Sequence, residues 1–219
     1  MKLDLWLYKM ERKISKIAIE RLMSLMTVAM TMVFIADVVF SYLAETPVSL
    51  YSLFYFDRAA IFSGQVWRVI TFLFLYPDAS NLIFIALGLY FYWWTGNAVE
   101  GYWGTARFNL YYLFGVIGSI IAGFIVGGMT NMYLNLTIFL AFTVMFPDVE
   151  VLLFFFIPIK VKWLGIFEGV MLIILFIFSG IVSRAAIIVA MLNFLLFFGR
   201  DLINKIRRAY REYKWRHRR

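Results

Sequence analysis

The chain has 219 residues, of which 63% are hydrophobic and 16% are charged, and its formal net charge is +8. Soluble domains are roughly half apolar and a quarter charged, so this composition excludes an ordinary soluble globule and indicates that lipid surrounds much of the chain. The absence of cysteine excludes disulfides, thiol catalysis and thiolate metal sites.

The first 22 residues predict a basic amphipathic helix. Apolar side chains recur at helical spacing, and basic side chains lie between them. These two sets are Leu3, Leu7, Met10, Ile14 and Ile17, and Lys9, Arg12, Lys13 and Lys16. A helix with this pattern favours the surface of an anionic membrane, and a solvated leader is the alternative.

Six apolar segments predict six transmembrane helices, because about 20 mostly apolar residues cross a bilayer and only a helix satisfies its own backbone there. The segments cover residues 23–43, 81–96, 106–126, 131–147, 164–181 and 184–200. Residues 44–80 are also apolar, but proline, glycine and charged residues interrupt them, and aromatic residues are frequent. This predicts a large first loop that rests in the membrane interface. Residues 149–163 predict a further apolar loop.

The chain is therefore expected to hold one membrane domain, residues 23–200, between a basic segment, residues 1–22, and a basic tail, residues 201–219. Six spans place both termini on one side. If that side is cytoplasmic, 18 of the 21 Lys and Arg residues lie inside, as the positive-inside rule requires. We expect a multi-pass protein of the bacterial cytoplasmic membrane, whose basic ends bind anionic lipids. We expect no nucleic acid partner.

Four short motifs occur in a fixed order between residues 60 and 200. They are Gly64-Gln65-Val66-Trp67-Arg68 with Thr71 and Phe74; Glu100, Gly104, Arg107 and Phe108; Tyr111-Tyr112-Leu113-Phe114-Gly115; and Phe146-Pro147-Asp148. In this order, and on the predicted sides of the membrane, the motifs resemble rhomboid-family membrane proteins. The Trp-Arg pair also resembles derlins, the non-proteolytic relatives of rhomboids. The resemblance implies an all-α, rhomboid-like bundle of six transmembrane helices with a large interfacial first loop.

Interface and turn chemistry account for the motif residues without catalysis. Arg68 needs a partner or an interfacial location, because an unpaired charge at depth is costly. Trp67 is expected to anchor the loop at head-group level. Glu100 is expected to accept hydrogen bonds from the turn before the third span, or to pair with Arg107. Gly104 allows a tight turn between two spans.

The groups needed for proteolysis are missing. The resemblance implies that an active member carries a serine at the start of the fourth span and a histidine base in the sixth. Asn135 occupies the serine position, and Ala186 stands near the histidine position. The single histidine, His217, lies in the basic tail. Asn81 and Ile85 replace the histidine and asparagine that would stabilise an oxyanion. The sequence predicts a pseudoprotease that is not an enzyme, with no metal and no cofactor.

Two acidic residues and two amides fall within the predicted spans. Asp37 in the first span and Glu168 in the fifth are costly in lipid, so they are expected to face protein, water or a partner. They are either structural groups or parts of a proton or substrate path. Asn135 and Asn193 are candidates for hydrogen bonds between helices.

The leading hypothesis is a non-proteolytic rhomboid-like protein that holds the transmembrane helix of a client protein. The resemblance implies a role in membrane-protein quality control or trafficking. A polar cavity containing Asn81, Asn135 and Asn193 would receive a polar residue of the client helix. Three alternatives stay open: a small transporter or channel that uses Asp37 and Glu168, an intramembrane protease with an unconventional site, and a lipid-interacting scaffold.

Overall fold

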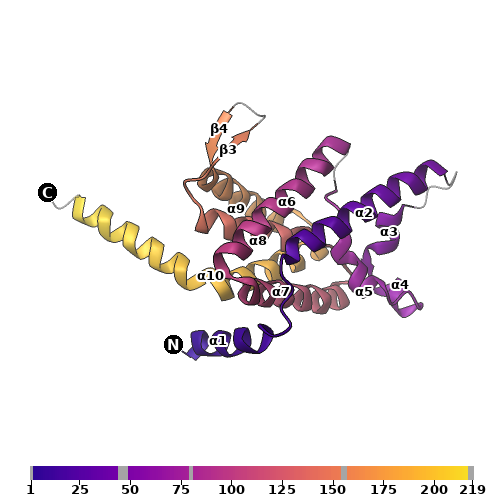
Figure 1. The fold of residues 1–219 in the computed structure, drawn as a ribbon, viewed down its shortest axis with the longest axis horizontal. Coiled ribbons are helices and arrows are strands. Elements are labelled where there is room, and N and C mark those ends of the chain that lie inside the picture. Colours follow the sequence, from indigo (N-terminus) through magenta and orange to yellow (C-terminus); the bar gives the residue numbers. More distant parts are fainter. Residues whose placement is uncertain (1, 44–48, 79–80, 154–156, 217–219) are drawn as a thin grey trace.

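The computed structural model describes residues 2–43, 49–78, 81–153 and 157–216, and the chain in these ranges is mainly helical (Figure 1). Within them, five helices are long and apolar enough to cross a membrane, as expected of a multi-pass membrane protein. These are α2 (Leu22–Leu43), α6 (Leu82–Trp103), α7 (Thr105–Val126), α9 (Val161–Phe178) and the first part of α10 (Ile181–Arg216).

A shorter apolar helix, α8 (Met132–Met145), lies among them. Its 14 residues span only about 21 Å, which is less than the roughly 30 Å of a bilayer core. Ten of the 14 side chains are buried. Helices α6, α9 and α10 pack on α8, so protein rather than lipid covers it on most sides. A helix that is apolar all round is stable in this central position.

The first loop folds into short elements at one end of the bundle. They are α3 (Leu50–Phe54), β1 (Phe56–Asp57), α4 (Arg58–Phe62), α5 (Arg68–Thr71) and a single 3₁₀ turn (Phe72–Phe74). Side-chain oxygens of Ser49 and Asp57 cap the first turns of α3 and α4. Strand β1 pairs antiparallel with β2 (Gly128–Met129), which follows α7. The pairing fixes the loop to the bundle.

At the opposite end, α6 runs seven residues past the end expected at residue 96. It stops at Trp103, and Gly104 alone connects it to α7. Gly104 has φ 86°, which is a conformation that residues with a Cβ rarely adopt. The tight turn expected at this glycine is present.

The N-terminal helix α1 (Lys2–Ile14) packs on α7. Leu7 is buried, and the Trp6 ring lies 5.7 Å from the ring of Phe114. The side chain of Asn109 in α7 bonds both the N–H and the carbonyl of Ile19, each at 2.9 Å. The segment is therefore attached to protein and does not only rest on a membrane surface.

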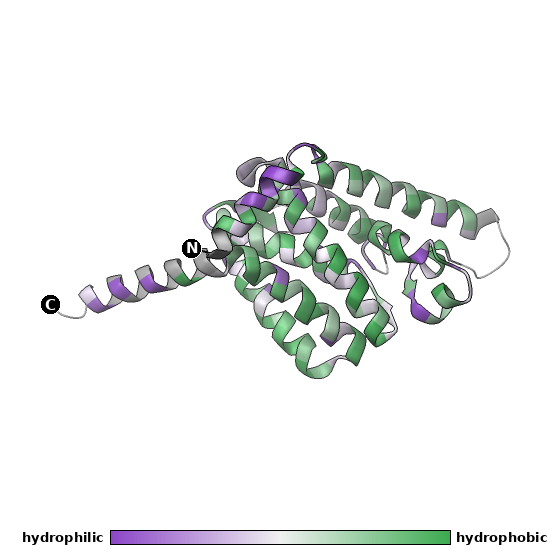
Figure 2. Cartoon of the chain, turned by 90° about the horizontal axis from the view of Figure 1, so that it is seen from below, coloured by the Kyte–Doolittle hydropathy of each residue, from purple (hydrophilic) through white to green (hydrophobic). Residues whose placement is uncertain are grey.

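The C-terminal half differs from expectation in two places. The expected loop 149–163 contains an antiparallel hairpin, β3 (Glu150–Leu153) and β4 (Ile157–Lys160). The sixth apolar segment and the basic tail form one helix of 36 residues, α10. Its hydrophilic end projects away from the apolar bundle (Figures 1 and 2). His217 lies outside the described residues.

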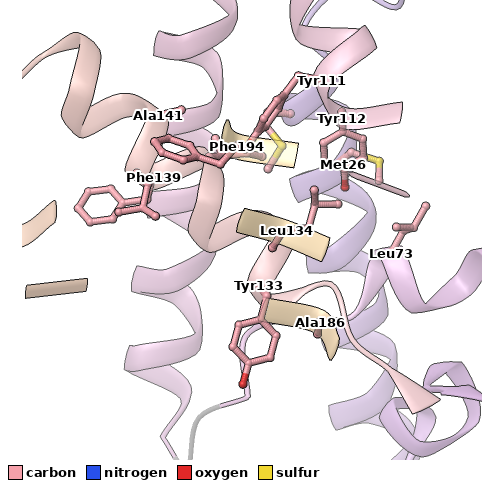
Figure 3. Close-up of a cluster of buried hydrophobic side chains, with 14 of the residues drawn as sticks. Met26, Leu73, Tyr111, Tyr112, Tyr133, Leu134, Phe139, Ala141, Ala186 and Phe194 are labelled. Atoms are coloured by element: carbon pink, nitrogen blue, oxygen red, sulfur yellow. The ribbon is translucent and has the colours of Figure 1, made fainter. Parts of the chain in front are cut away.

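Large aromatic side chains fill the interior, and Figure 3 shows part of this cluster. The ring of Trp103 stacks on Phe198 with 4.3 Å between centroids. Two glycines let α7 approach its neighbours. A Cβ on Gly118 would collide with Val189 of α10, and one on Gly115 would collide with Leu134 of α8. Small residues allow the same close packing between helices in membranes.

Candidate functional site

Asp37 joins the first membrane helix to the first loop. Its side chain is 5% exposed and accepts hydrogen bonds from the Ser49 hydroxyl, from the Leu50 N–H at 2.6 Å and from the Tyr76 hydroxyl. Burial, followed by the hydrogen bond to Asp37, raises the pKa of the Tyr76 hydroxyl, so Tyr76 remains a donor. The geometry gives Asp37 a structural role.

Arg68 of the Trp-Arg motif connects three parts of the first loop. The guanidinium is 7% exposed and donates to the Gln65 side chain at 2.7 Å. It also donates to the carbonyls of Ser52 and Tyr55, at 2.7 and 2.8 Å. These carbonyls lie near the C-terminal end of α3. Arg68 therefore has partners, as a cation at this depth requires.

The motif residues around Arg68 shape the outward face of the loop. Gly64 has φ 107°, which allows the chain to turn after α4. Phe62, Val66, Trp67 and Ile70 expose large apolar surfaces. Trp67 in the interface was expected, and this apolar face suits the same location.

Glu100 contacts a different partner from the one expected. Its carboxylate accepts a hydrogen bond from the backbone N–H of Arg21, at 2.8 Å, just before α2 begins. The expected pairing with Arg107 is wrong. Arg107 lies 3.6 Å from Glu11 and stacks over the ring of Trp103. Because α6 extends to Trp103, Glu100 belongs to its last turn and faces the start of α2.

Sequence reasoning missed Asn131. This buried side chain donates hydrogen bonds to the carbonyls of Leu73 and Leu75, both at 2.8 Å. It thereby fixes the end of the first loop to the start of α8. An asparagine before a helix predicts a cap, but the Asn131 side chain makes no capping bond.

The positions aligned with catalytic residues carry buried, unreactive side chains. Asn135 in α8 is 1% exposed, and neither atom of its amide has a hydrogen-bond partner in the described ranges. Ala186 is buried in α10, which packs on α8, and it lies beside Tyr133 in Figure 3. Ile85 is buried in α6. The nearby hydroxyls of Thr137 and Thr143 bond back to carbonyls of their own helix.

Asn81 does not join the other two asparagines. It is exposed at the start of α6, where its side chain accepts a hydrogen bond from the N–H of Ile83 at 2.9 Å. Its role is to cap the helix. The expected cavity of three asparagines is therefore wrong, because Asn81 is exposed and caps α6. The cause is local, since a polar side chain before an apolar helix satisfies the free N–H groups of the first turn.

Four polar side chains lie on four different helices of the bundle, and we refer to them together as the polar layer: Tyr92, Tyr111, Glu168 and Asn193. Glu168 lies within electrostatic range of the hydroxyls of Tyr92 and Tyr111. Asn193 donates to the carbonyl of Tyr111 at 3.0 Å, while its own carbonyl oxygen has no partner among the described residues. Neither oxygen of Glu168 is hydrogen-bonded there either. The polar layer therefore offers unused acceptors.

Two apolar grooves open on the sides of the bundle. One, of about 410 Å³, lies between α2 and α6 and includes Phe34, Leu89 and Trp93. The other, of about 500 Å³, lies between α9 and α10 and includes Gly169 and Met191. Neither groove is lined by a charged residue. Their surfaces suit acyl chains.

Within the described parts of the chain, no three His, Cys, Asp or Glu side chains gather where they could hold a metal ion. Comparison of the sequence with protein-family models gives no match, and comparison with curated proteins gives none either. The resemblance to rhomboids therefore rests on the motifs alone.

Proposed function

We propose that this chain is a non-proteolytic, rhomboid-like membrane protein that binds the transmembrane helices of client proteins. The observation that carries the proposal is the environment of α8. This helix is buried at the centre, and its Asn135 stands where the motif alignment expects a serine. An amide cannot form the acyl-enzyme that a serine forms.

The proposal includes six membrane crossings, with α8 as the short fourth crossing inside the bundle. Contacts at the helix ends support an arrangement in which successive helices run in opposite directions across the membrane. Glu100 reaches Arg21 at one end, whereas Asp37 reaches Ser49 and Asn131 reaches Leu75 at the other. The end near Arg21 also holds α1, the hairpin and the basic part of α10. By the positive-inside rule that end is cytoplasmic, in the bacterial cytoplasmic membrane of our expectation.

The client helix would lie between α6 and α9. Both helices pack extensively on α8, while they touch each other little. Leu87 of α6 and Met171 of α9 are exposed and lie outside the two apolar grooves. The face between them gives a client helix lateral access to α8. Holding a helix without cutting it suits quality control or trafficking of membrane proteins.

Site-specific photocrosslinking in reconstituted membranes tests this proposal. A photoreactive residue at position 87 or 171 is expected to capture single-span client peptides. The control is position 121 in α7, because Ile121 is even more exposed (57%, against 43% for Leu87 and 38% for Met171) and belongs to neither α6 nor α9. Equal capture at all three positions, or capture of lipid alone, contradicts the proposal.

The alternatives have less support. A transporter that uses Asp37 and Glu168 needs both side chains along one proton or substrate path. Asp37 is instead hydrogen-bonded to Ser49 and Leu50 of the first loop, whereas Glu168 belongs to the polar layer. A protease with an unconventional site needs a base near a free hydroxyl, and Thr137 and Thr143 are bonded to backbone carbonyls. For a lipid scaffold, α1 would have to be available, whereas it packs on α7.

A further inference from the structure

Glu168 differs from the other buried acids of the described chain. Asp37 and Glu100 both accept backbone hydrogen bonds, whereas neither oxygen of Glu168 has a partner in those ranges. The side chain is only 8% exposed. It lies seven residues into α9, about 10 Å from the cytoplasmic end of that helix. A carboxylate at this depth without hydrogen bonds is costly in free energy, and such groups mark functional sites in membrane proteins.

The chain supplies no cation at the level of Glu168 in the parts that the structure describes. Lys160 and Lys162, before and in the first turn of α9, both lie 3.9 Å from Asp148. Arg184, at the other end of the bundle, donates to the carbonyl of Ile177. A cation that pairs with Glu168 would therefore come from another molecule.

The register of α9 sets the direction in which Glu168 points. Gly165 lies against Thr143, so the face of α9 that carries residues 161, 165, 168 and 172 meets α8. Residues 166, 169, 170 and 173 line the groove towards α10. At 100° per residue, Glu168 lies on the edge of the α8-facing side that is turned away from α10. Helices α6, α9 and α10 all pack on α8, so the edge of α9 that is turned away from α10 is turned towards α6.

The polar groups nearby define the chemistry of the partner. The oxygens of Glu168 and the side-chain carbonyls of Asn135 and Asn193 are all acceptors without a donor. Gly165 of α9 lies against Thr143 of the antiparallel α8, so Asn135 lies about five residues, roughly 7.5 Å, farther along α8 than the level of Glu168. It is on the face of α8 that carries Phe139. Phe139 packs on Phe91 of α6. Several acceptors and one negative charge suit a cation with several N–H donors.

We propose that Glu168 selects client helices that carry a lysine or arginine near the middle of the membrane. This inference rests on the proposed function and names its client class. The client helix enters between α6 and α9, and its ammonium or guanidinium group pairs with Glu168 and with the amide oxygen of Asn135. Helix α9 has the smallest buried share of the five long helices, 22%, so displacing it disrupts the fewest contacts.

Binding of single-span peptides to the full chain in lipid nanodiscs tests the inference. Three fluorescent peptides share one apolar host helix and carry leucine, lysine or aspartate at the centre. The wild-type chain is expected to bind the lysine peptide about tenfold more tightly than the leucine peptide, which corresponds to the roughly 1–2 kcal/mol of a polar contact between membrane helices. Glu168→Gln is expected to abolish this preference and to keep the affinity for the leucine peptide.

A charge exchange gives the sharper test. Glu168→Lys is expected to prefer the aspartate peptide over the lysine peptide. Asp37→Asn is the matched control, because Asp37 is a second buried acid that the first loop already occupies, and it is expected to keep the wild-type preference. If the three peptides bind equally to the wild-type chain, this inference is wrong while the proposed function stands. If no peptide binds at all, the proposed function fails as well.

Discussion

Asp37 and Tyr76 are separated by 39 residues in the sequence and are joined by a hydrogen bond from the tyrosine hydroxyl to the carboxylate. The ring of Tyr76 also lies edge-on to Phe34, with 5.0 Å between centroids, and to Tyr51, with 5.3 Å. The end of the first loop is thus held against the first membrane helix by the polar contact with Asp37 and the aromatic contact with Phe34, and against α3 by the aromatic contact with Tyr51.

Tyr76→Phe is expected to lower the free energy of unfolding by about 1–2 kcal/mol, because it removes one donor from a buried carboxylate and keeps the ring contacts. Thermal unfolding in detergent measures the change. Tyr90→Phe is the control, since Tyr90 is exposed, and it is expected to have no effect. Equal stability of Tyr76→Phe and wild type contradicts the clamping role.

Arg68→Ala is expected to loosen the first loop more strongly, by about 1–3 kcal/mol for each of the three acceptors that it leaves without a donor. Arg68→Lys keeps the charge but not the forked geometry of the guanidinium. Its loss of stability is therefore expected to lie between those of the wild-type chain and Arg68→Ala. Limited proteolysis within residues 49–78 measures the loosening. Arg12→Ala, at an exposed position, is the control. Wild-type cleavage rates in both Arg68 variants contradict the prediction.

Gly123→Ala is expected to destabilise the chain by about 1–3 kcal/mol, because a Cβ there would lie 2.6 Å from the ring of Phe56. Gly169→Ala is the matched control. It adds the same methyl group to a membrane helix where nothing lies within 4 Å, so no loss is expected. Phe56→Leu in the Gly123→Ala background should recover part of the loss if the ring causes it. Thermal unfolding of these three variants and of the wild-type chain checks this.

Glu168→Leu is expected to raise the free energy of unfolding in the absence of a client, by about 1–3 kcal/mol. The substitution removes a buried acid that forms no hydrogen bond in the described ranges. Asp37→Leu is expected to do the opposite, since it breaks three hydrogen bonds. If Glu168→Leu destabilises the chain as strongly as Asp37→Leu, Glu168 is a structural residue rather than a site for a partner.

Stability is expected to fall in alkaline solution. Burial, followed by the nearby charge of Asp78, raises the pKa of Tyr51 to about 12. The pKa of Tyr76 is raised as well. Above the ordinary tyrosine pKa of about 10, the unfolded chain loses protons that the folded chain keeps. The free energy of unfolding therefore decreases from about pH 10 upwards, and by well under the limit of about 1.4 kcal/mol per pH unit for one proton, because both tyrosines are partly exposed and water screens their charges. Unfolding of the Tyr51→Phe and Tyr76→Phe variants between pH 8 and 12 should show a shallower decrease.

The sequence predicted the long helices well because apolar length alone determines them. All five helices of membrane-spanning length overlap segments predicted from composition. The sequence also predicted the roles of two individual residues. Gly104 forms the expected tight turn, and Arg68 has the expected hydrogen-bond partners.

The sequence did not predict which side chains form contacts between segments that are far apart in the chain. Nothing in the residues around Glu100 indicates that its acceptor lone pairs face Arg21, because that contact depends on how far α6 extends. Asn131 looks like a helix cap, although its side chain bonds the first loop. Asn81 looks like an interior amide, although it caps α6. In each case several partners were within reach of one side chain, and tertiary packing selected among them.

Helix α10 contains no break between the apolar part that carries Asn193 and the basic end. Because α10 is continuous, a small tilt of the helix near Asn193 displaces its C-terminal end by a larger distance. A tilt of α10 at Asn193 would therefore move residues 200–216, which make up about 25 Å of the same helix. In the topology that we propose, this end of the helix lies in the cytoplasm, where its position would report whether the interior of the bundle is occupied.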